Sequence, residues 1–160
     1  MSEKIKDEIK KIAYDTFQIT CYMFPLDDWE AVEMAGSERP GYQKAAVVAF
    51  DGAVNGMMVI KPCRQMYDAI AANMLGVDEA TDAEKEAALC EIANIICGNT
   101  VPLFARNSKI CLIKPPEILK ENQQFENKTI GMNKEVLAIF FDEGTAEISI
   151  FYENGGQLND

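Results

Sequence analysis

The sequence contains no histidine among its 160 residues. This absence removes the commonest general base, any Ser–His or Cys–His nucleophile pair and the commonest zinc ligand. The chain also lacks a glycine-rich phosphate loop and a serine nucleophile elbow. If the protein is an enzyme, the reactive groups therefore belong mostly to its substrate, and we expect no metal or cofactor of its own.

Long apolar runs are also missing. None reaches the roughly 20 residues that a membrane-spanning helix needs, and the first 11 residues are charged throughout, without the apolar centre of a signal peptide. The formal net charge of −11 argues against a nucleic acid or an anionic membrane as main partner. We therefore expect a cytoplasmic protein, whose acidic surface suits a partner with a basic patch or simply keeps the protein soluble.

The five cysteines form no Cys-x-x-Cys pair. Their number is odd and most lie in apolar stretches, which predicts reduced and mostly buried thiols. A redox role for Cys63, at a predicted helix start, is the alternative. The cysteines are Cys21, Cys63, Cys90, Cys97 and Cys111.

Hydrophobic periodicity and turn residues predict one α+β domain over residues 1–160, with a flexible tail from about residue 154. Long helices should pack in one layer on a mostly antiparallel sheet built from hairpins. The two hairpins resemble each other, which indicates a weak internal duplication. In order, we expect a helix at 3–24, a short edge strand at 28–34, a hairpin at 44–61, a helix from Pro62 to about Gly76, a helix from 81 to about 106, a strand at 110–113, a polar loop at 117–130 and a hairpin at 136–152.

The second strand of the last hairpin, from Ala146 to Tyr152, alternates apolar and polar residues. This pattern predicts a strand with one face that is solvated or covered by a partner.

The helix that begins at Thr81 carries the most informative pattern. Thr81 and Glu84 have the spacing of a capping box, in which each side chain binds a backbone N–H of the other residue. At about 100° per residue, an apolar stripe faces the core. Its residues are Leu89, Ile92, Ala93, Ile96 and Thr100.

The opposite side of this helix carries Ala87, Glu91, Asn94 and Gly98. One carboxylate and one carboxamide thus lie one turn apart, with a small residue before and after them. A partner surface could approach closely and would meet Glu91 and Asn94 first. The alternative is an ordinary solvated helix face, because Glu-x-x-Asn occurs by chance in a chain of this size.

Residues 52–116 resemble the CheC/CheX/FliY family of chemotaxis phosphatases, most of all its CheX branch. The resemblance rests on Gly56-Met-Met-Val-Ile, Asn73-Met-Leu-Gly, an acidic loop, Glu91-Ile-Ala-Asn-Ile-Ile-Cys-Gly-Asn and Pro115-Pro116. The sequence differs from the family pattern at one position, because Ala87 stands where the family has an acid or a serine. The first helix has no Glu-x-x-Asn, so we expect one site per chain, as in CheX.

The resemblance implies a CheC-like fold and a phosphatase acting on the aspartyl phosphate of a CheY-type receiver, with Mg²⁺ held by that receiver. Glu91 and Asn94 would be the catalytic pair, Ala87 and Gly98 would belong to the docking face, and a homodimer through the sheet is implied. A CheX-like module that binds a receiver or another partner without catalysis is the first alternative. An unrelated structural domain is the second.

Overall fold

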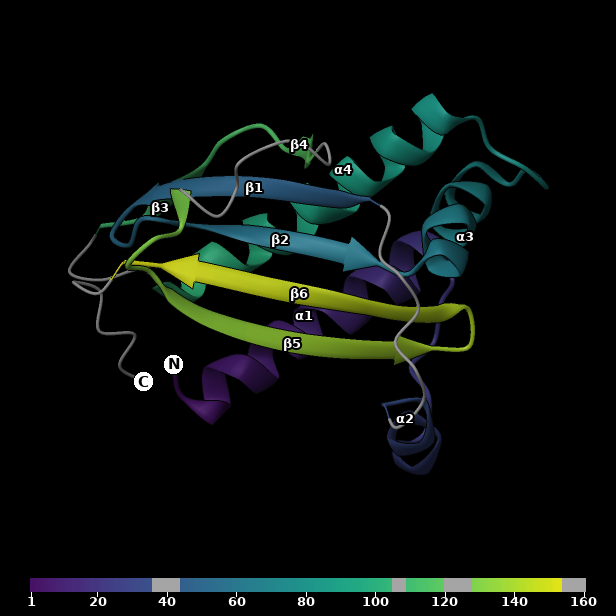
Figure 1. The fold of residues 1–160 in the computed structure, drawn as a ribbon, viewed down its shortest axis with the longest axis horizontal. Helices are drawn as coiled ribbons and strands as arrows, with labels where there is room; N and C mark the ends of the chain where they lie inside the picture. Colours follow the sequence, from purple (N-terminus) through teal and green to yellow (C-terminus); the bar gives the residue numbers. More distant parts are fainter. Residues whose placement is uncertain (36–43, 105–108, 120–127, 154–160) are drawn as a thin grey trace.

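The computed structural model describes residues 1–35, 44–104, 109–119 and 128–153. Figure 1 shows two layers, with one twisted sheet in front and the long helices crossing behind it. This arrangement confirms the predicted α+β fold. The predicted tail from about residue 154 lies outside the described residues.

The sheet has six strands in the order β3-β1-β2-β6-β5, with β4 also paired to β1, and all its pairings are antiparallel. The two predicted hairpins are β1–β2 and β5–β6, and their second strands meet at the centre of the sheet. The strands are β1 (Ala45–Gly52), β2 (Gly56–Pro62), β3 (Cys111–Ile113), β4 (Glu117–Leu119), β5 (Asn133–Phe141) and β6 (Gly144–Tyr152).

Four α-helices are described: α1 (Glu3–Cys21), α2 (Asp28–Ala35), α3 (Arg64–Leu75) and α4 (Asp82–Thr100), the last followed by the 3-10 helix η1 (Val101–Phe104). Helix α1 ends three residues before the predicted position because Tyr22 takes the left-handed conformation, with φ 55°, and caps it. Helix α4 stops at Thr100 rather than near residue 106. Pro102 has no N–H to continue the helical ladder, and η1 follows.

The core lies between the sheet and the helices. Phe17 of α1 and Phe141 of β5 are fully buried and their rings lie 5.2 Å apart. Ile148 and Ile150 of β6 belong to the same buried cluster. Side chains from both ends of the chain therefore share one core.

The segment at residues 28–34 is wrongly predicted as an edge strand, because the structure places it in helix α2. Seven residues are too few to distinguish the helical period of 3.6 residues from the two-residue alternation of a strand. Glu, Ala and Met in this segment favour a helix. The edge of β5 is instead contacted by the residues just before α2. Pro25 forms an isolated bridge with Phe141, and Leu26 N–H donates to the Phe140 carbonyl at 3.1 Å.

Two further boundaries differ from the sequence prediction. Pro62 ends β2 instead of opening α3, and it pairs only with Ala146 of β6, since the β1–β2 pairing stops at Ile60. Its missing N–H is harmless there because one side of the strand is free of ladder bonds. Residues 117–119 form β4 rather than loop, a strand too short to show a period.

Strand β6 is buried on both faces apart from Glu147, so the predicted solvated or partner-covered face is wrong. Its alternating polar residues Thr145 and Ser149 are only 8% and 2% exposed. The strand lies between β2 and β5, and neighbouring side chains cover its outer face. A second small cluster, Ala45, Val59 and Phe151, lies on that side of the sheet.

The segment Asp82–Phe104, which comprises α4 and η1, is long and apolar enough to cross a membrane by length and composition alone. Half of its most apolar window is buried inside the domain. Core helices of globular domains have the same composition, so this property is weak evidence for a membrane span.

We predict that Gly98→Ala stabilises the protein by about 0.5–1 kcal/mol, because alanine loses less backbone freedom than glycine in a helix. A Cβ at Gly98 would meet only Ile113 Cδ1, at 3.7 Å. Gly144→Ala is the control: its φ is 141° and its Cβ would collide with Cys63 Sγ, so it should destabilise. Urea unfolding measures both, and a Gly98→Ala variant less stable than wild type would contradict the described packing.

Candidate functional site

The start of helix α4 is held by the predicted capping box. Glu84 N–H donates to Thr81 Oγ1 at 3.2 Å, and Thr81 N–H donates to Glu84 Oε1 at 3.0 Å. The hydrogen bond from the Thr81 backbone N–H, and after it the Thr81 side chain, hold the pKa of the Glu84 carboxyl below its usual value. The first turn of α4 is therefore well defined.

The apolar stripe of α4 is buried as predicted, with Leu89, Ile92, Ala93, Ile96 and Thr100 all at 0% exposure. Two ion pairs join the polar flank of the helix to its surroundings. Lys85 Nζ lies 2.9 Å from Asp68 Oδ1 of α3, and Lys44 pairs with Glu86. Core packing and these flanking contacts together determine which side of α4 faces outward.

The outward side carries the four residues that the sequence singled out. Ala87 and Glu91 are exposed, whereas Asn94 and Gly98 are half-buried. Glu91 and Asn94 lie one turn apart, so their carboxylate and amide are presented to the same approaching surface.

Within the described part of the chain, neither Glu91 nor Asn94 has a hydrogen-bond or ion-pair partner. Other amides are engaged: Asn73 donates to the Cys21 carbonyl at 2.9 Å, and Asn99 to the Ile95 carbonyl at 2.9 Å. The donor and acceptor groups of Asn94 and the carboxylate of Glu91 are thus available to another molecule.

The helix surface beside Glu91 and Asn94 carries only small residues. Ala87 lies one turn before Glu91, and Gly98 lies one turn after Asn94, where an added Cβ would meet only the end of the Ile113 side chain. No side chain longer than a methyl group projects at either position, so a partner can approach the helix backbone closely.

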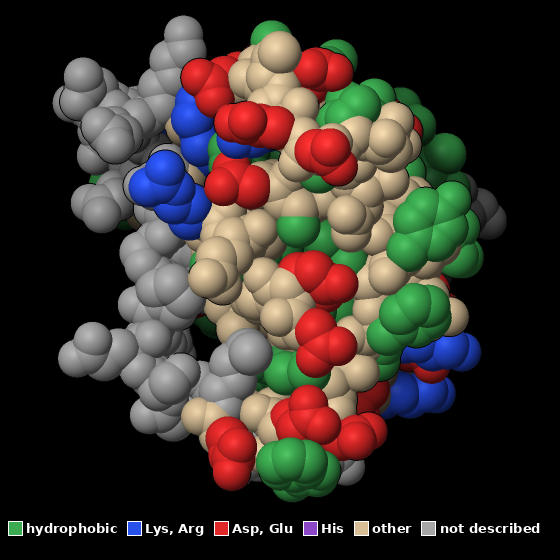
Figure 2. Space-filling model, turned by 90° about the vertical axis from the view of Figure 1, so that its right-hand side faces the viewer, with side chains coloured by type: hydrophobic (Ala, Val, Ile, Leu, Met, Phe, Trp, Pro, Cys, Tyr) green, Lys and Arg blue, Asp and Glu red, His purple; other side chains and the backbone are tan. Residues whose placement is uncertain are grey.

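Acidic side chains dominate the end of the molecule around the start of α4. Figure 2 shows Asp and Glu spread over this end, with Lys and Arg near its margins. Asp78, Glu79, Asp82 and Glu84 are all exposed. A partner with basic groups around its own site would be attracted to this end of the protein.

The thiols do not form a second centre. All five cysteines are free and four are buried, with Cys90 half-buried. Burial raises the pKa of the Cys97 thiol to about 12, so it stays protonated and unreactive near neutral pH. Cys63 is 1% exposed and accepts a hydrogen bond from Thr145 N–H, which does not favour a redox role. The described residues contain no group of three or more His, Cys, Asp or Glu suited to a metal ion.

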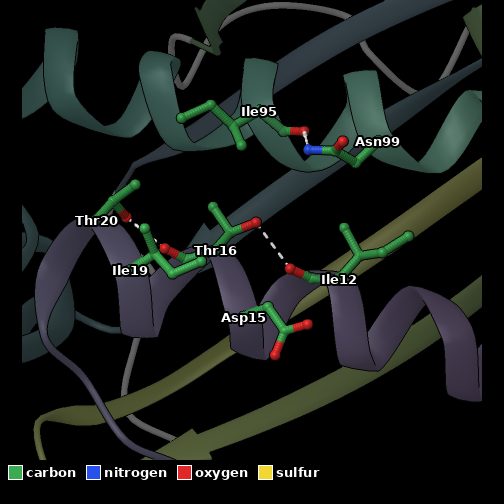
Figure 3. A pocket seen from close by; sticks show the side chains of 7 residues that line it. All are labelled: Ile12, Asp15, Thr16, Ile19, Thr20, Ile95 and Asn99. Atoms are coloured by element: carbon green, nitrogen blue, oxygen red, sulfur yellow. Dashed lines mark hydrogen bonds between the residues drawn. The ribbon is translucent and has the colours of Figure 1, made fainter.

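The structure also shows a groove of about 370 Å³ between α1 and α4, which the sequence did not predict (Figure 3). Helices α1 and α4 lie side by side there, although the residues concerned are about 80 positions apart in the sequence. The one signal available was Ile19, an apolar residue of the predicted helix at 3–24. Its 76% exposure marks it as part of a surface rather than of the core.

Solved structures share this fold. CheX from Desulfovibrio desulfuricans aligns with a TM-score of 0.68 and 14% identity over 94% of this chain and 99% of its own. A chain of the CheX–CheY–BeF3–Mg²⁺ complex from Borrelia burgdorferi aligns with a TM-score of 0.68 and 18% identity, over 94% of this chain and 98% of its own. FliY from Thermotoga maritima aligns with a TM-score of 0.58 and 14% identity, over 98% of this chain and 93% of its own. At these identities the likeness establishes the fold.

Sequence comparison is more specific. A search of curated protein sequences finds no significant match. The sequence profile of the family described as chemotaxis phosphatase CheX matches residues 44–142, a span that includes β1 to β5 and the whole of α4. Since this match covers more than half of the 160 residues, the chain belongs to the chemotaxis phosphatase CheX family, within the wider CheC/CheX/FliY group.

Proposed function

We propose that this protein accelerates hydrolysis of the aspartyl phosphate on a CheY-type receiver in chemotaxis or another two-component pathway. The observation that carries the proposal is the pair Glu91 and Asn94, unpartnered among the described residues and presented on a capped helix of a CheX-family chain. One related structure is a CheX–CheY–BeF3–Mg²⁺ complex, which makes a CheY-type receiver the natural partner.

The receiver supplies most of the chemistry in this proposal. Its phosphoryl group is already neutralised by the receiver's own Mg²⁺ and lysine, so this chain needs no metal or cofactor. This chain contributes the positioning of the attacking water. Asn94 enters the receiver's site, and its amide oxygen accepts a hydrogen bond from the attacking water and holds that water in line with the P–O bond. Water forms the new bond to phosphorus, the receiver's aspartate leaves as carboxylate, and the water's proton goes to the phosphate product.

A neutral amide is a poor base, which explains why Asn94 is suited to orientation rather than proton removal. In the loose transition state of phosphoryl transfer little proton removal is needed before the P–O bond breaks. A histidine or a carboxylate at the same place would not be required. The proposed mechanism therefore agrees with a chain that has no histidine.

Glu91 acts as the anchor. Its exposed carboxylate pairs with the receiver's active-site lysine, in a charge-assisted hydrogen bond that is shielded from water once the surfaces meet. The small residues Ala87 and Gly98 let the receiver reach the helix. We place the protein in the cytoplasm, where such receivers operate.

A second candidate function is receiver binding without catalysis. The observation that favours it is Ala87, which is exposed and has no polar group where the family carries an acid or serine. In that case Glu91 still anchors the receiver, but the hydrolysis rate stays at the receiver's own value.

We also propose a homodimer through the sheet. Strand β5 ends the sheet order, and only its last residues, near Phe140 and Phe141, are contacted by the segment after α1. Earlier along the same strand, Val136 is 46% exposed. An edge strand with an exposed apolar side chain can pair with the same strand of a second copy.

The phosphatase proposal predicts that adding this protein with Mg²⁺ to a phosphorylated CheY-type receiver speeds phosphate release, which a phosphate-release assay measures. Asn94→Ala should lower the acceleration more than about tenfold but keep most binding, because only the water loses its position. Glu91→Ala should lose both the acceleration and the binding of the receiver. Exposed Gln65 and Glu8 give the matched controls Gln65→Ala and Glu8→Ala, which should behave as wild type. Full activity in Asn94→Ala would show that the amide does not position the water.

We predict that Ala87→Asp raises the maximal rate of receiver dephosphorylation, because it restores an acidic group one turn before Glu91. Ala87 is exposed, so the change should leave the unfolding free energy within about 0.5 kcal/mol of wild type. Ala87→Asn, which has the same size without the charge, is the control. An unchanged rate in Ala87→Asp would mean that the departure from the family pattern has no catalytic cost.

The dimer proposal predicts a molecular mass near 36 kDa in solution, twice the 17.8 kDa of one chain. Val136→Lys should shift the protein to the monomer, because a charge on the edge strand opposes strand pairing. Light scattering after size-exclusion chromatography measures both. Ile130→Lys, at an exposed position in the turn before β5, is the control; a wild-type monomer at high concentration would exclude the dimer.

A further inference from the structure

The groove between α1 and α4 has polar residues on its walls, but three of them donate hydrogen bonds to backbone carbonyls of their own helices. Thr16 donates its hydroxyl to the Ile12 carbonyl at 2.7 Å, and Thr20 donates to the Thr16 carbonyl at 2.5 Å. Asn99 donates its amide to the Ile95 carbonyl, as the dashed lines in Figure 3 show. Both threonine hydroxyl protons and one amide N–H of Asn99 are thus used within the helices, and the groove presents mainly carbon atoms to a bound partner.

Isoleucines provide most of this apolar surface. Ile12 and Ile95 are half-buried, on α1 and α4 respectively, and Ile19 is 76% exposed. One charged group accompanies them: the exposed carboxylate of Asp15, which has no ion-pair or hydrogen-bond partner among the described residues. The groove therefore offers an apolar surface with a single unpaired negative charge.

The groove continues directly from Glu91. Ile95 lies one helical turn after Glu91 and within about 40° of it around α4, so their Cα atoms are about 6 Å apart. The helices run in opposite directions in Figure 3, where Ile95 faces Thr20 and Asn99 lies toward Ile12. Glu91 therefore lies beyond the Thr20 end of the groove, on the same surface.

The size of ordinary interfaces connects these two features. A specific complex buries about 800 Å² on each partner, a patch roughly 16 Å in radius, and weak signalling contacts bury somewhat less. A groove that begins about 6 Å from the anchoring carboxylate falls inside such a patch. Whatever docks on Glu91 and Asn94 must either fill the groove or leave water on its isoleucines.

We propose that the groove between α1 and α4 is a second docking site for the same receiver, and that it accepts an apolar side chain flanked by a lysine or arginine. This inference rests on the proposed function. The apolar side chain packs on Ile19 and Ile95, and the cation pairs with Asp15. Glu91 and Asn94 contact groups that receivers share around the phosphoryl site, so the groove is where one receiver is distinguished from another.

Binding measurements with Ile19→Glu test the proposal. The probes are the CheY-type receivers of the organism that encodes this chain, each loaded with beryllofluoride and Mg²⁺, titrated by isothermal calorimetry. We expect Ile19→Glu to raise Kd about tenfold or more, since it removes apolar contact and adds a charge. Asp15→Asn should raise Kd about two- to fivefold at low salt and lessen its salt dependence.

Ile130→Glu is the matched control, because Ile130 is 77% exposed against 76% for Ile19. It precedes the start of β5, whereas the end of α1 lies near the end of β5, where Pro25 bridges Phe141. The nine residues of β5 place the two positions roughly 25–30 Å apart. Circular dichroism of each variant verifies that the fold is kept.

The outcomes separate this inference from the function on which it rests. If wild type binds a receiver and accelerates its dephosphorylation, but Ile19→Glu binds within twofold of wild type, the groove proposal is overturned and the phosphatase stands. If wild type binds without acceleration and Ile19→Glu weakens binding, the phosphatase proposal fails and the groove is supported. If wild type binds none of the receivers, both are overturned.

Discussion

Burial of one side of α4 is the constraint on which the rest of the structure depends. Leu89, Ile92 and Ile96 are fully buried, and each such side chain stabilises the fold by about 1.5–3 kcal/mol. The surface ion pairs of Lys44 and Lys85 are screened by solvent and contribute much less. Packing therefore dictates the rotation of the helix, and the ion pairs only support it. With that side inward, Glu91 can point only to solvent.

The proposed site offers polar groups that are available to another molecule. Amides elsewhere, such as Asn73 and Asn99, are bound to backbone carbonyls, and Glu84 and Glu86 have partners of their own. Glu91 and Asn94 have none among the described residues, although Asn94 is half-buried. A pair left free beside two small residues can be reached by another molecule. The groove behind it differs, because the hydroxyls of Thr16 and Thr20 are bound within α1 and Asp15 is its one unpaired charge among the described residues.

The wrong predictions concern segments whose structure depends on neighbouring elements rather than on their own sequence. Residues 28–34 and 117–119 are short, and a short segment takes its conformation from what its neighbours leave open. The edge of β5 is contacted by Pro25 and Leu26, so the next residues were free to form a helix. Strand β6 alternates in sequence, yet Ile148 and Ile150 pack in the core with the helices and Ser149, between them, is also buried.

Local sequence patterns were enough to predict the long elements and the capped helix with its two stripes, because capping and helical period are local properties of the chain. It also supplied the Glu91 and Asn94 pair and, through residues 44–142, the family. Strand order, the burial of β6 and the groove between α1 and α4 could not be predicted in this way and are seen only in the folded chain. Those features depend on contacts between residues such as Ile19 and Ile95, which are distant in the chain and meet only when the core is packed.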